Sequence, residues 1–332
     1  MKILNKFKKS KPEINSQQVN GSNNSDIKTK KFTLSALSWP KFKKDYKEFN
    51  IFLGKNLTLL LASIFKNLRT YIYVYVIPIT LLLIIYTFQS FGGINKLLPP
   101  IVAGYLLIPG FGITILLNTL ISEWKASIFL KRIHVIGTSK YQFILSIWIV
   151  GYLLGMSSIF LGSCLLLGIA PLINSTSNVF LETFSFFSYG SASEVFVSWF
   201  GFFIAASIIT LSGIGIATLI AGAFKSLSLC QSLTILIICG CIMLSDLFLS
   251  PTITSKSSFV VYISYLIPQK YGAWTVFYSS AAGNINYFID NPTSKLATIS
   301  FANIYGPLFG GITYCIGLYV ASLFTFNWNN RG

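Results

Sequence analysis

Six long apolar segments between residues 71 and 326 limit the folds that this chain can adopt. About 20 apolar residues in helical conformation cross the ~30 Å hydrocarbon core of a bilayer. Backbone amides and carbonyls must be hydrogen-bonded in lipid, and apolar runs of this length favour helices over barrel strands. The sequence therefore predicts an all-α polytopic membrane protein with six transmembrane helices, at about residues 71–91, 100–121, 141–169, 197–222, 228–249 and 305–326.

The charge of the chain is low in amount and uneven in distribution. Only 10% of the residues are charged, against about 25% in ordinary soluble domains. The formal net charge is +16, and 15 of the 25 Lys and Arg residues precede residue 71. No aromatic and basic module of a nucleic-acid-binding domain accompanies them. We therefore expect membrane lipid, and no nucleic acid, as the partner of these cations.

The part of the chain before the first span divides into two predicted regions. Residues 1–48 are polar and basic, which predicts a disordered cytoplasmic tail. Residues 49–70 place leucines at helical spacing and cations largely on the other side, which predicts an amphipathic helix in the membrane interface. A plain extension of the first span is the alternative. We expect residues 71–328 to form one six-helix transmembrane domain.

Cations also predict the orientation of the spans. With the N-terminus in the cytoplasm, 21 Lys and Arg residues lie on the inner side and four on the outer side. Inner loops of membrane proteins are enriched in Lys and Arg. We therefore expect a multi-pass protein of the cell membrane with both termini in the cytoplasm. Two long outer segments, 170–196 and 250–304, are also expected, and the second contains a stretch that could lie at the interface or dip into the membrane.

The inner loop after the second span combines charged and apolar residues. Glu123, Lys125, Lys131 and Arg132 alternate with apolar side chains over residues 121–143. One interpretation is a short amphipathic helix that offers its charged side to a partner. The other is an ordinary inner loop, enriched in cations by orientation alone. Periodicity and charge do not choose between them.

Three motifs in order give the chain a resemblance to a known family. The segment SIFLKRI (Ser127 to Ile133) follows an acid after the second span. MLSDLFLSP (Met243 to Pro251) ends the fifth span, and ISYLIPQKY (Ile263 to Tyr271) follows outside. Together with an interfacial helix and six spans, over roughly residues 50–328, they resemble the type-2 ABC transporter permeases, the membrane subunits of bacterial exporters. The chain departs from the pattern at Asp246, where a Gly is common, and near Gly137, where a Pro often stands.

The resemblance implies a function, partners and a docking site. The chain would be the permease subunit of an ABC exporter, paired with a second permease subunit and driven by a separately encoded ATPase that uses ATP. The chain itself would bind no cofactor and would not be an enzyme. The resemblance makes SIFLKRI a coupling helix, with Ile128, Phe129 and Ile133 as its apolar underside. The docking residues we expect are Glu123, Lys125, Ile128, Phe129, Lys131, Arg132 and Ile133.

Asp246 has two interpretations from the sequence. Acids are costly in the membrane interior and usually have a partner or water there. Because Asp246 lies five residues before Pro251, near the predicted outer end of the fifth span, it could be an interfacial acid. It could instead face a wet outer vestibule and influence which substrate leaves.

Other function classes have little support in the residues. No G-x-x-x-x-G-K-[ST] motif for nucleotide phosphates is present. Nine acids and a single His offer no convincing acid–base pair, nucleophilic triad or metal site. The main alternative is a secondary transporter or channel-like protein that works without nucleotide. The glycine pairs of the third and sixth spans could pack within the chain or against a second copy.

Overall fold

The computed structural model describes residues 46–91, 99–135, 137–173, 192–224, 226–249, 251–281 and 299–326. The described elements are helices, and no strand occurs among them. The predicted tail, residues 1–48, lies almost wholly outside the described residues. The helices are α1 (Tyr46–Phe65), α2 (Leu68–Tyr71), α3 (Ile77–Phe91), α4 (Pro99–Tyr105), α5 (Gly112–Ala126), α6 (Phe129–Val135), α7 (Lys140–Ile173), α9 (Ala192–Ala223), α10 (Leu227–Leu244), α11 (Pro251–Thr254), α12 (Ser258–Ser264), α13 (Pro268–Ser280) and α15 (Tyr305–Thr325).

The predicted class is confirmed: the chain is an all-α polytopic protein with six helices long and apolar enough to cross a membrane, among the described residues. These spans are Leu68–Phe88, Pro100–Ala126, Lys140–Ile169, Ala192–Ala223, Leu227–Leu244 and Tyr305–Thr325. Most boundaries lie within a few residues of those predicted. The fifth span ends earlier than expected, at Leu244, and the second runs on to Ala126.

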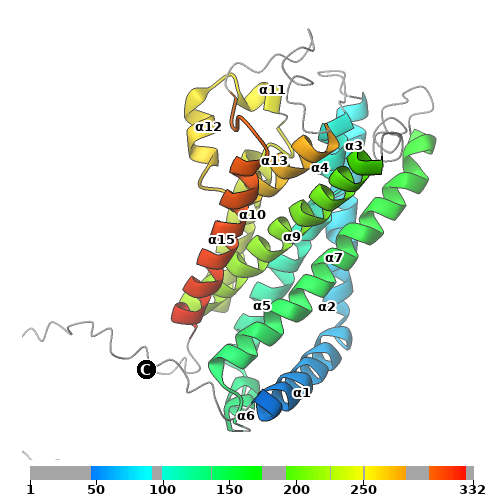
Figure 1. Ribbon diagram of the computed structural model, residues 1–332. Coiled ribbons are helices and arrows are strands. Elements are labelled where there is room, and N and C mark those ends of the chain that lie inside the picture. Colours follow the sequence, from blue (N-terminus) through cyan, green and yellow to red (C-terminus); the bar gives the residue numbers. More distant parts are fainter. Residues whose placement is uncertain are drawn as a thin grey trace, which may run out of the picture. The chain divides into compact units, whose positions relative to one another are not determined.

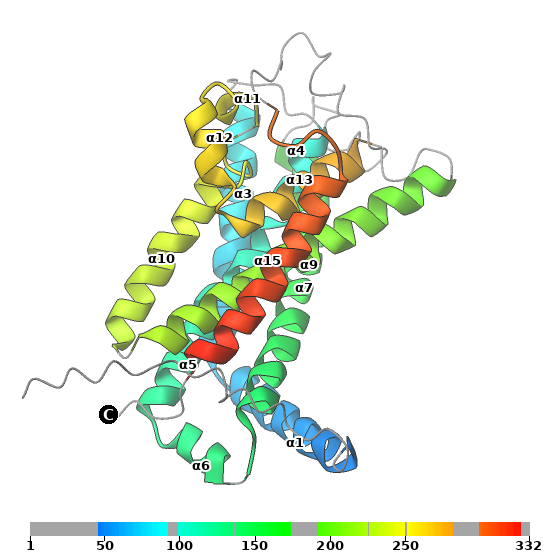
Figure 2. The ribbon, with the colours of Figure 1, turned by 60° about the vertical axis from the view of Figure 1, so that its left-hand side comes forward.

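The second span forms the centre of the bundle. It is the most enclosed of the six, and its helix α5 packs against α7, α9 and α10. The first, fifth and sixth spans have only a minority of their residues buried in the single chain. Helices α1 and α6 lie at one end of the bundle, and α11 and α12 lie at the other (Figures 1 and 2). We refer to these as the α6 end and the α12 end.

The predicted helix over residues 49–70 is present but interrupted. Helix α1 ends at Phe65, and α2 begins after Asn67, whose side chain accepts a hydrogen bond from the amide of Arg69 at 3.1 Å. An Asn at this position is a favoured helix N-cap. Leu60 and Ile64 of α1 are buried, and α1 packs along α7. Helix α1 therefore has the predicted apolar face, and α2 already belongs to the first span.

Two prolines interrupt the first two spans, and one hydroxyl of α7 lies near both of them. Pro78 has no amide hydrogen to give to the carbonyl of Val74, and a π-helix (Ile72–Val76) precedes it. Pro109 lies in a 3₁₀ turn (Ile108–Phe111) between α4 and α5, and its carbonyl accepts from the amide of Gly112. Ser158 of α7 is fully buried and donates to the carbonyl of Val74, and its hydroxyl lies 3.3 Å from the carbonyl of Pro109. A neighbouring helix thus supplies the donor that Pro78 lacks, as expected inside a membrane.

Helix α13 occupies the long segment that the sequence left ambiguous. It packs against α4, α9 and α15, and nearly all of its side chains are buried. The preceding helix α12 instead exposes Phe259 and Tyr262, aromatic residues of the kind found at membrane interfaces. The segment therefore combines both predicted interpretations, with one helix on the surface and the next inside the bundle.

Glycines allow close approach between the central helices. Side chains built at Gly151 and Gly155 of α7 would meet Leu117 of α5 and Thr210 of α9 at 2.8 and 2.4 Å. A side chain built at Gly310 of α15 would meet the Tyr271 ring of α13 at 2.5 Å. These glycine pairs serve packing within the chain, which is one of the two roles that the sequence left open.

Replacing Gly112 by Ala should destabilise the protein, whereas Gly240→Ala should not. A Cβ at Gly112 would lie 2.4 Å from the backbone oxygen of Tyr73 and 2.3 Å from Cγ of Pro78, neither of which can easily move. Overpacking of this kind costs about 1–3 kcal/mol. Gly240, inside α10, has no atom within 4 Å of a built Cβ. Thermal unfolding of the purified chain in detergent measures both, and equal midpoints for the two variants would contradict this packing.

Candidate functional site

Helix α6 is a separate short helix held between two defined turns. After α5, Ser127 is extended, and its hydroxyl accepts a hydrogen bond from the amide of Phe129 at 3.2 Å. After α6, Gly137 has φ +94°, a left-handed conformation that glycine adopts without strain. Ser139 and Gln142 then exchange hydrogen bonds of 3.3 and 2.9 Å between side chain and backbone and start α7. This is a capping box, which fixes where α7 begins.

The apolar side of α6 differs in one residue from the prediction. Leu130 and Ile133 are buried in the same core cluster as Trp124. The Phe129 ring lies 5.1 Å from the ring of Trp124, so Phe129 is also on the inner side. The prediction that Ile128 belongs to this underside is wrong. Ile128 lies before the first helical residue and is 65% exposed. Leu130 takes its place.

The outer side of α6 is a mixed basic and apolar surface. Arg132 is exposed, Val135 is 84% exposed, and Ile128 adds a second bare apolar side chain at the start of the helix. Lys131 belongs to α6, but its side chain lies outside the described residues. We call Ile128, Arg132 and Val135 the α6 surface. Exposed apolar side chains beside a cation are typical of a surface that binds another protein.

Glu123 and Lys125 lie on the last turns of α5 and interact within the chain. Glu123 forms an ion pair with Arg69 of α2. The ammonium of Lys125 donates to the carbonyls of Ala221 and Gly222, at 2.6 and 3.0 Å. These carbonyls end α9, where cations are favourable because of the helix dipole. Both residues were predicted to dock a partner, but the structure uses their charges to connect the ends of spans one, two and four.

At the α12 end, Asp246 has an unusual backbone conformation. It follows Ser245, the last capping residue of α10, and has φ +63°. The position after a helix C-cap often adopts this left-handed conformation and is usually Gly, because a Cβ there is strained. This explains physically why a Gly would be expected at residue 246. Asp is one of the few other residue types that adopt this conformation regularly.

The carboxylate of Asp246 is fully buried, and both of its oxygens have partners. Thr254 of α11 donates to Oδ1 at 2.6 Å, and the indole of Trp274 in α13 donates to Oδ2 at 2.7 Å. The ammonium of Lys270 lies 3.4 Å from Oδ2, and neither charged side chain is exposed. Buried charges are tolerated when they are paired and hydrogen-bonded in this way. Asp246 therefore connects three helices.

Lys270 needs this carboxylate. It is the third residue of α13, where the helix dipole disfavours a cation. Its ammonium also donates to the hydroxyl of Ser264 and lies 4.9 Å from the centre of the Tyr265 ring. Helix α13 lies outside the six candidate spans. Burial lowers the pKa of Lys270 from its ordinary value, and the charge and hydrogen bond of Asp246 oppose this shift.

The vestibule predicted for Asp246 is therefore absent from this structure, because the side chain has no exposed surface. The alternative, an interfacial acid near the outer end of the fifth span, stays a prediction; Asp246 lies two residues after that span ends at Leu244. Sequence reasoning missed Lys270, Trp274 and Thr254. One signal was available: Lys270 and Trp274 are four residues apart, so a helix would place both on one side toward a common partner. We call Asp246, Thr254, Lys270 and Trp274 the Asp246 cluster.

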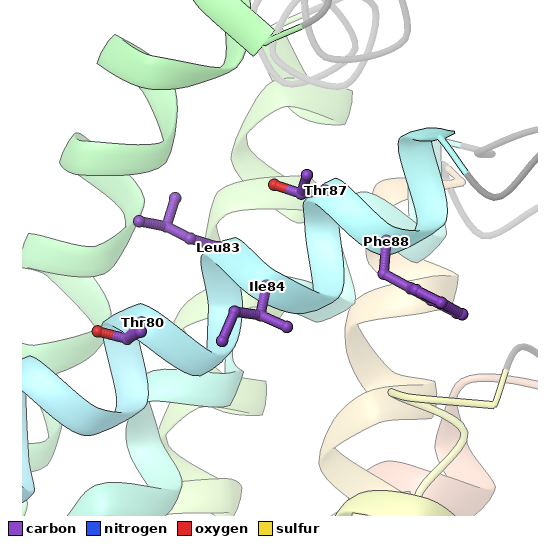
Figure 3. A pocket seen from close by; sticks show the side chains of 5 residues that line it. All are labelled: Thr80, Leu83, Ile84, Thr87 and Phe88. Carbon is purple, nitrogen blue, oxygen red and sulfur yellow. The ribbon is translucent and has the colours of Figure 1, made fainter.

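One surface hollow lies along α3. It has a volume of about 410 Å³ and is lined by Thr80, Leu83, Ile84, Thr87 and Phe88 (Figure 3). All five residues come from a single helix, and Ile84 and Phe88 are more than half exposed. The lining has no charged group that could activate a substrate. An apolar helix face of this kind is suited to contact with lipid or with another helix.

In the described part of the chain, no three His, Cys, Asp or Glu side chains lie close enough together to hold a metal ion. The chain matches no protein-family model, no curated protein and no solved structure. The functional argument therefore depends on the chain's own residues.

Replacing Lys125 by Met should destabilise the protein without removing it from the membrane. The substitution keeps an unbranched apolar side chain but leaves the carbonyls of Ala221 and Gly222 without the ammonium group that donates to them. Loss of a charged hydrogen bond costs about 1.5–3 kcal/mol. Lys55→Met, on the exposed side of α1, is the matched control. Thermal unfolding in detergent should show a lower midpoint for Lys125→Met alone; identical midpoints would refute this role.

The Asp246–Lys270 pair should show strong coupling in a double-mutant cycle. Asp246→Asn and Lys270→Met each leave a buried partner uncompensated, and breaking a buried pair costs about 3–5 kcal/mol. Asn also tolerates a positive φ, so the first variant tests the charge rather than the backbone.

The double variant Asp246→Asn/Lys270→Met should unfold at a higher temperature than either single variant, because it removes both charges. Lys256→Met, at an exposed cation of the same end, provides the control. Additive effects of the two substitutions would show that the charges do not interact.

Proposed function

We propose that this chain is the permease subunit of an ABC exporter, which moves a substrate across the cell membrane when a separate ATPase subunit binds it. One observation carries the proposal: between spans two and three, a short helix packs its apolar side against the bundle and presents a basic and apolar side outward. A loop that only reverses the chain between two spans needs no such helix, whereas a docked partner needs an ordered surface to bind.

The α6 surface has the chemistry of a docking site. Arg132 supplies a fixed positive charge for an acidic partner, and Ile128 and Val135 supply apolar contact. Contacts of this type bury apolar area at the centre and leave charges at the rim. Leu130 and Ile133 anchor the helix to the bundle, so a partner that grips α6 also grips α5.

The orientation of the protein in the membrane is part of the same proposal. The α6 end carries most of the described cations, among them Lys55, Lys66 and Arg69. The positive-inside rule then assigns the α6 end, and both termini, to the cytoplasm. Helix α1 would lie against the anionic inner leaflet, with its cations toward the lipid headgroups.

A second permease subunit, identical or different, would cover part of the exposed apolar surface. In the single chain, only a minority of the residues of the first, fifth and sixth spans are buried. Lipid covers some of this surface in any membrane protein. The hollow on α3, between Ile84 and Phe88, could receive side chains of a neighbouring helix (Figure 3).

ATP would act on this chain only through its partner. Binding of ATP favours one arrangement of the ATPase, and a docked α6 passes that preference to the spans through differential affinity. The contacts of Glu123 with Arg69 and of Lys125 with Ala221 provide the connection from the α6 end of α5 to spans one and four.

A secondary transporter that works without nucleotide is the alternative. One observation favours it: Asp246 and Lys270 form a buried ionisable pair, and such pairs occur along ion pathways. In this chain, however, the pair lies after the fifth span and its carboxylate is saturated with donors. The two functions are separated by whether an ATPase binds.

Charge reversal on α6 should release the ATPase. In membranes of the native host, Lys131→Glu/Arg132→Glu should reduce co-purification of the ATPase about tenfold or more, because opposed charges are replaced by like charges. Val135→Asp should have the same effect through its apolar contact. The amount of inserted chain, measured by an affinity tag, should not change.

Lys55→Glu/Lys66→Glu is the control, since it introduces the same charge change at two exposed positions of the same end of the bundle, on α1 and directly after it. An ATPase that co-purifies equally with the Lys131→Glu/Arg132→Glu variant would contradict the docking role of α6. Absence of any ATPase from the unmodified chain would instead favour the alternative function.

A further inference from the structure

Several polar side chains in the middle of the bundle have buried atoms without a hydrogen-bond partner. Three of these residues, Thr114, Asn118 and Ser122, are on α5, and a fourth, Thr234, is on α10. Asn118 is 1% exposed, and both polar atoms of its amide are unpaired. In a protein interior such groups cost free energy, and inside a membrane they are usually retained for a function.

The three residues of α5 share one side of the helix, because they are four residues apart. Their neighbour is α9: a Cβ built at Gly213 would lie 2.5 Å from the hydroxyl of Thr114. Ala217, four residues after Gly213, is also fully buried. Thr114 thus lies against Gly213, and neither Gly213 nor Ala217 offers a side-chain hydrogen-bonding group.

Thr234 belongs to the narrow buried side of α10. The buried residues of this helix are Cys230, Thr234, Ile238, Cys241 and Ile242, and α10 packs mainly against α5. We call Thr114, Asn118, Ser122 and Thr234 the polar seam. Its side chains are almost wholly buried where α5 packs against α9 and α10.

The seam is polar but uncharged. Its members are three hydroxyl groups and one amide. Lys125, near its α6 end, already donates to the carbonyls of α9. A charged ligand would therefore find no opposite charge there, whereas hydroxyl and amide groups would find both donors and acceptors.

From this chemistry we infer that the polar seam opens in a second arrangement of the helices and binds uncharged, hydrogen-bonding groups of the transported molecule. The inference rests on the proposed function, since it assigns a substrate class to the permease. Opening would give the Asn118 amide the partners that it lacks here. Closing would return the side chains to the arrangement described.

Thiol labelling of the full chain in membranes tests the inference. Asn118→Cys is compared with Leu117→Cys, both in a chain whose five native cysteines are replaced by Ala. Leu117 is the matched control: it is adjacent, fully buried, and packs instead against Gly151 of α7. The probes are three small methanethiosulfonates, one neutral with a hydroxyethyl group, one cationic and one anionic, with and without ATP.

The neutral reagent should label Asn118→Cys about tenfold or more faster than it labels Leu117→Cys, because only the seam admits polar groups. It should also be faster than either charged reagent. Equal labelling of the two positions, in both conditions, would overturn the opening of the seam. Labelling by a charged reagent at the rate of the neutral one would overturn the substrate class.

Stability gives a second measurement that does not depend on ATPase binding. Asn118→Leu replaces the unpaired amide by an apolar group of similar length, so the thermal midpoint of the chain should rise. Loss of a structural hydrogen bond would lower it, and that result would overturn the inference. If Asn118→Cys is labelled as expected but no ATPase co-purifies with the chain, the inference about the seam stands and the exporter proposal is refuted. The failure of one can therefore be distinguished from the failure of the other.

Discussion

In a membrane, every backbone amide and carbonyl needs a hydrogen-bond partner, and the core of this protein depends on how that demand is met. Helices satisfy it except at Pro78 and Pro109, which interrupt the first and second spans. Ser158 of α7 donates to the carbonyl of Val74, which Pro78 leaves without an amide partner, and its hydroxyl lies 3.3 Å from the carbonyl of Pro109. Spans one, two and three must therefore meet at this residue. The glycines of α7 allow the same helix to approach α5 and α9 closely, so backbone satisfaction and packing determine one arrangement.

Much of this fold could be predicted because length and hydropathy alone define a span. The six helices follow from runs of apolar residues, and the separate α6 follows from the charges between them. The ends of helices were harder to predict from the sequence where the backbone conformation of a single residue determines them. Helix α10 ends at Leu244 because Asp246 adopts a positive φ, although the apolar run continues. Likewise, α6 starts at Phe129 after the Ser127 turn, which exposes Ile128 and turns Leu130 inward.

The Asp246 cluster could not be derived from the sequence, because its partners lie far apart along the chain. Asp246 and Trp274 are separated by 28 residues, with α11 and α12 between them. A buried ion pair is weak evidence for stability, since desolvation offsets most of the attraction. It does discriminate between arrangements: an alternative packing of α13 would leave Lys270 charged and alone. The cluster is best understood as a device that selects one position of α13 against α10.

Helix α6 is attached to the bundle on both of its sides. Toward α5, the connection continues through Ser127 to a helix whose end is fastened to α9 by the ammonium of Lys125. Toward α7, Gly137 donates its amide to the carbonyl of His134 at 3.1 Å, and the buried Thr138 donates its hydroxyl to Asn56 of α1 at 3.2 Å. A displacement of α6 would therefore reach span four through Lys125 and helix α1 through Thr138.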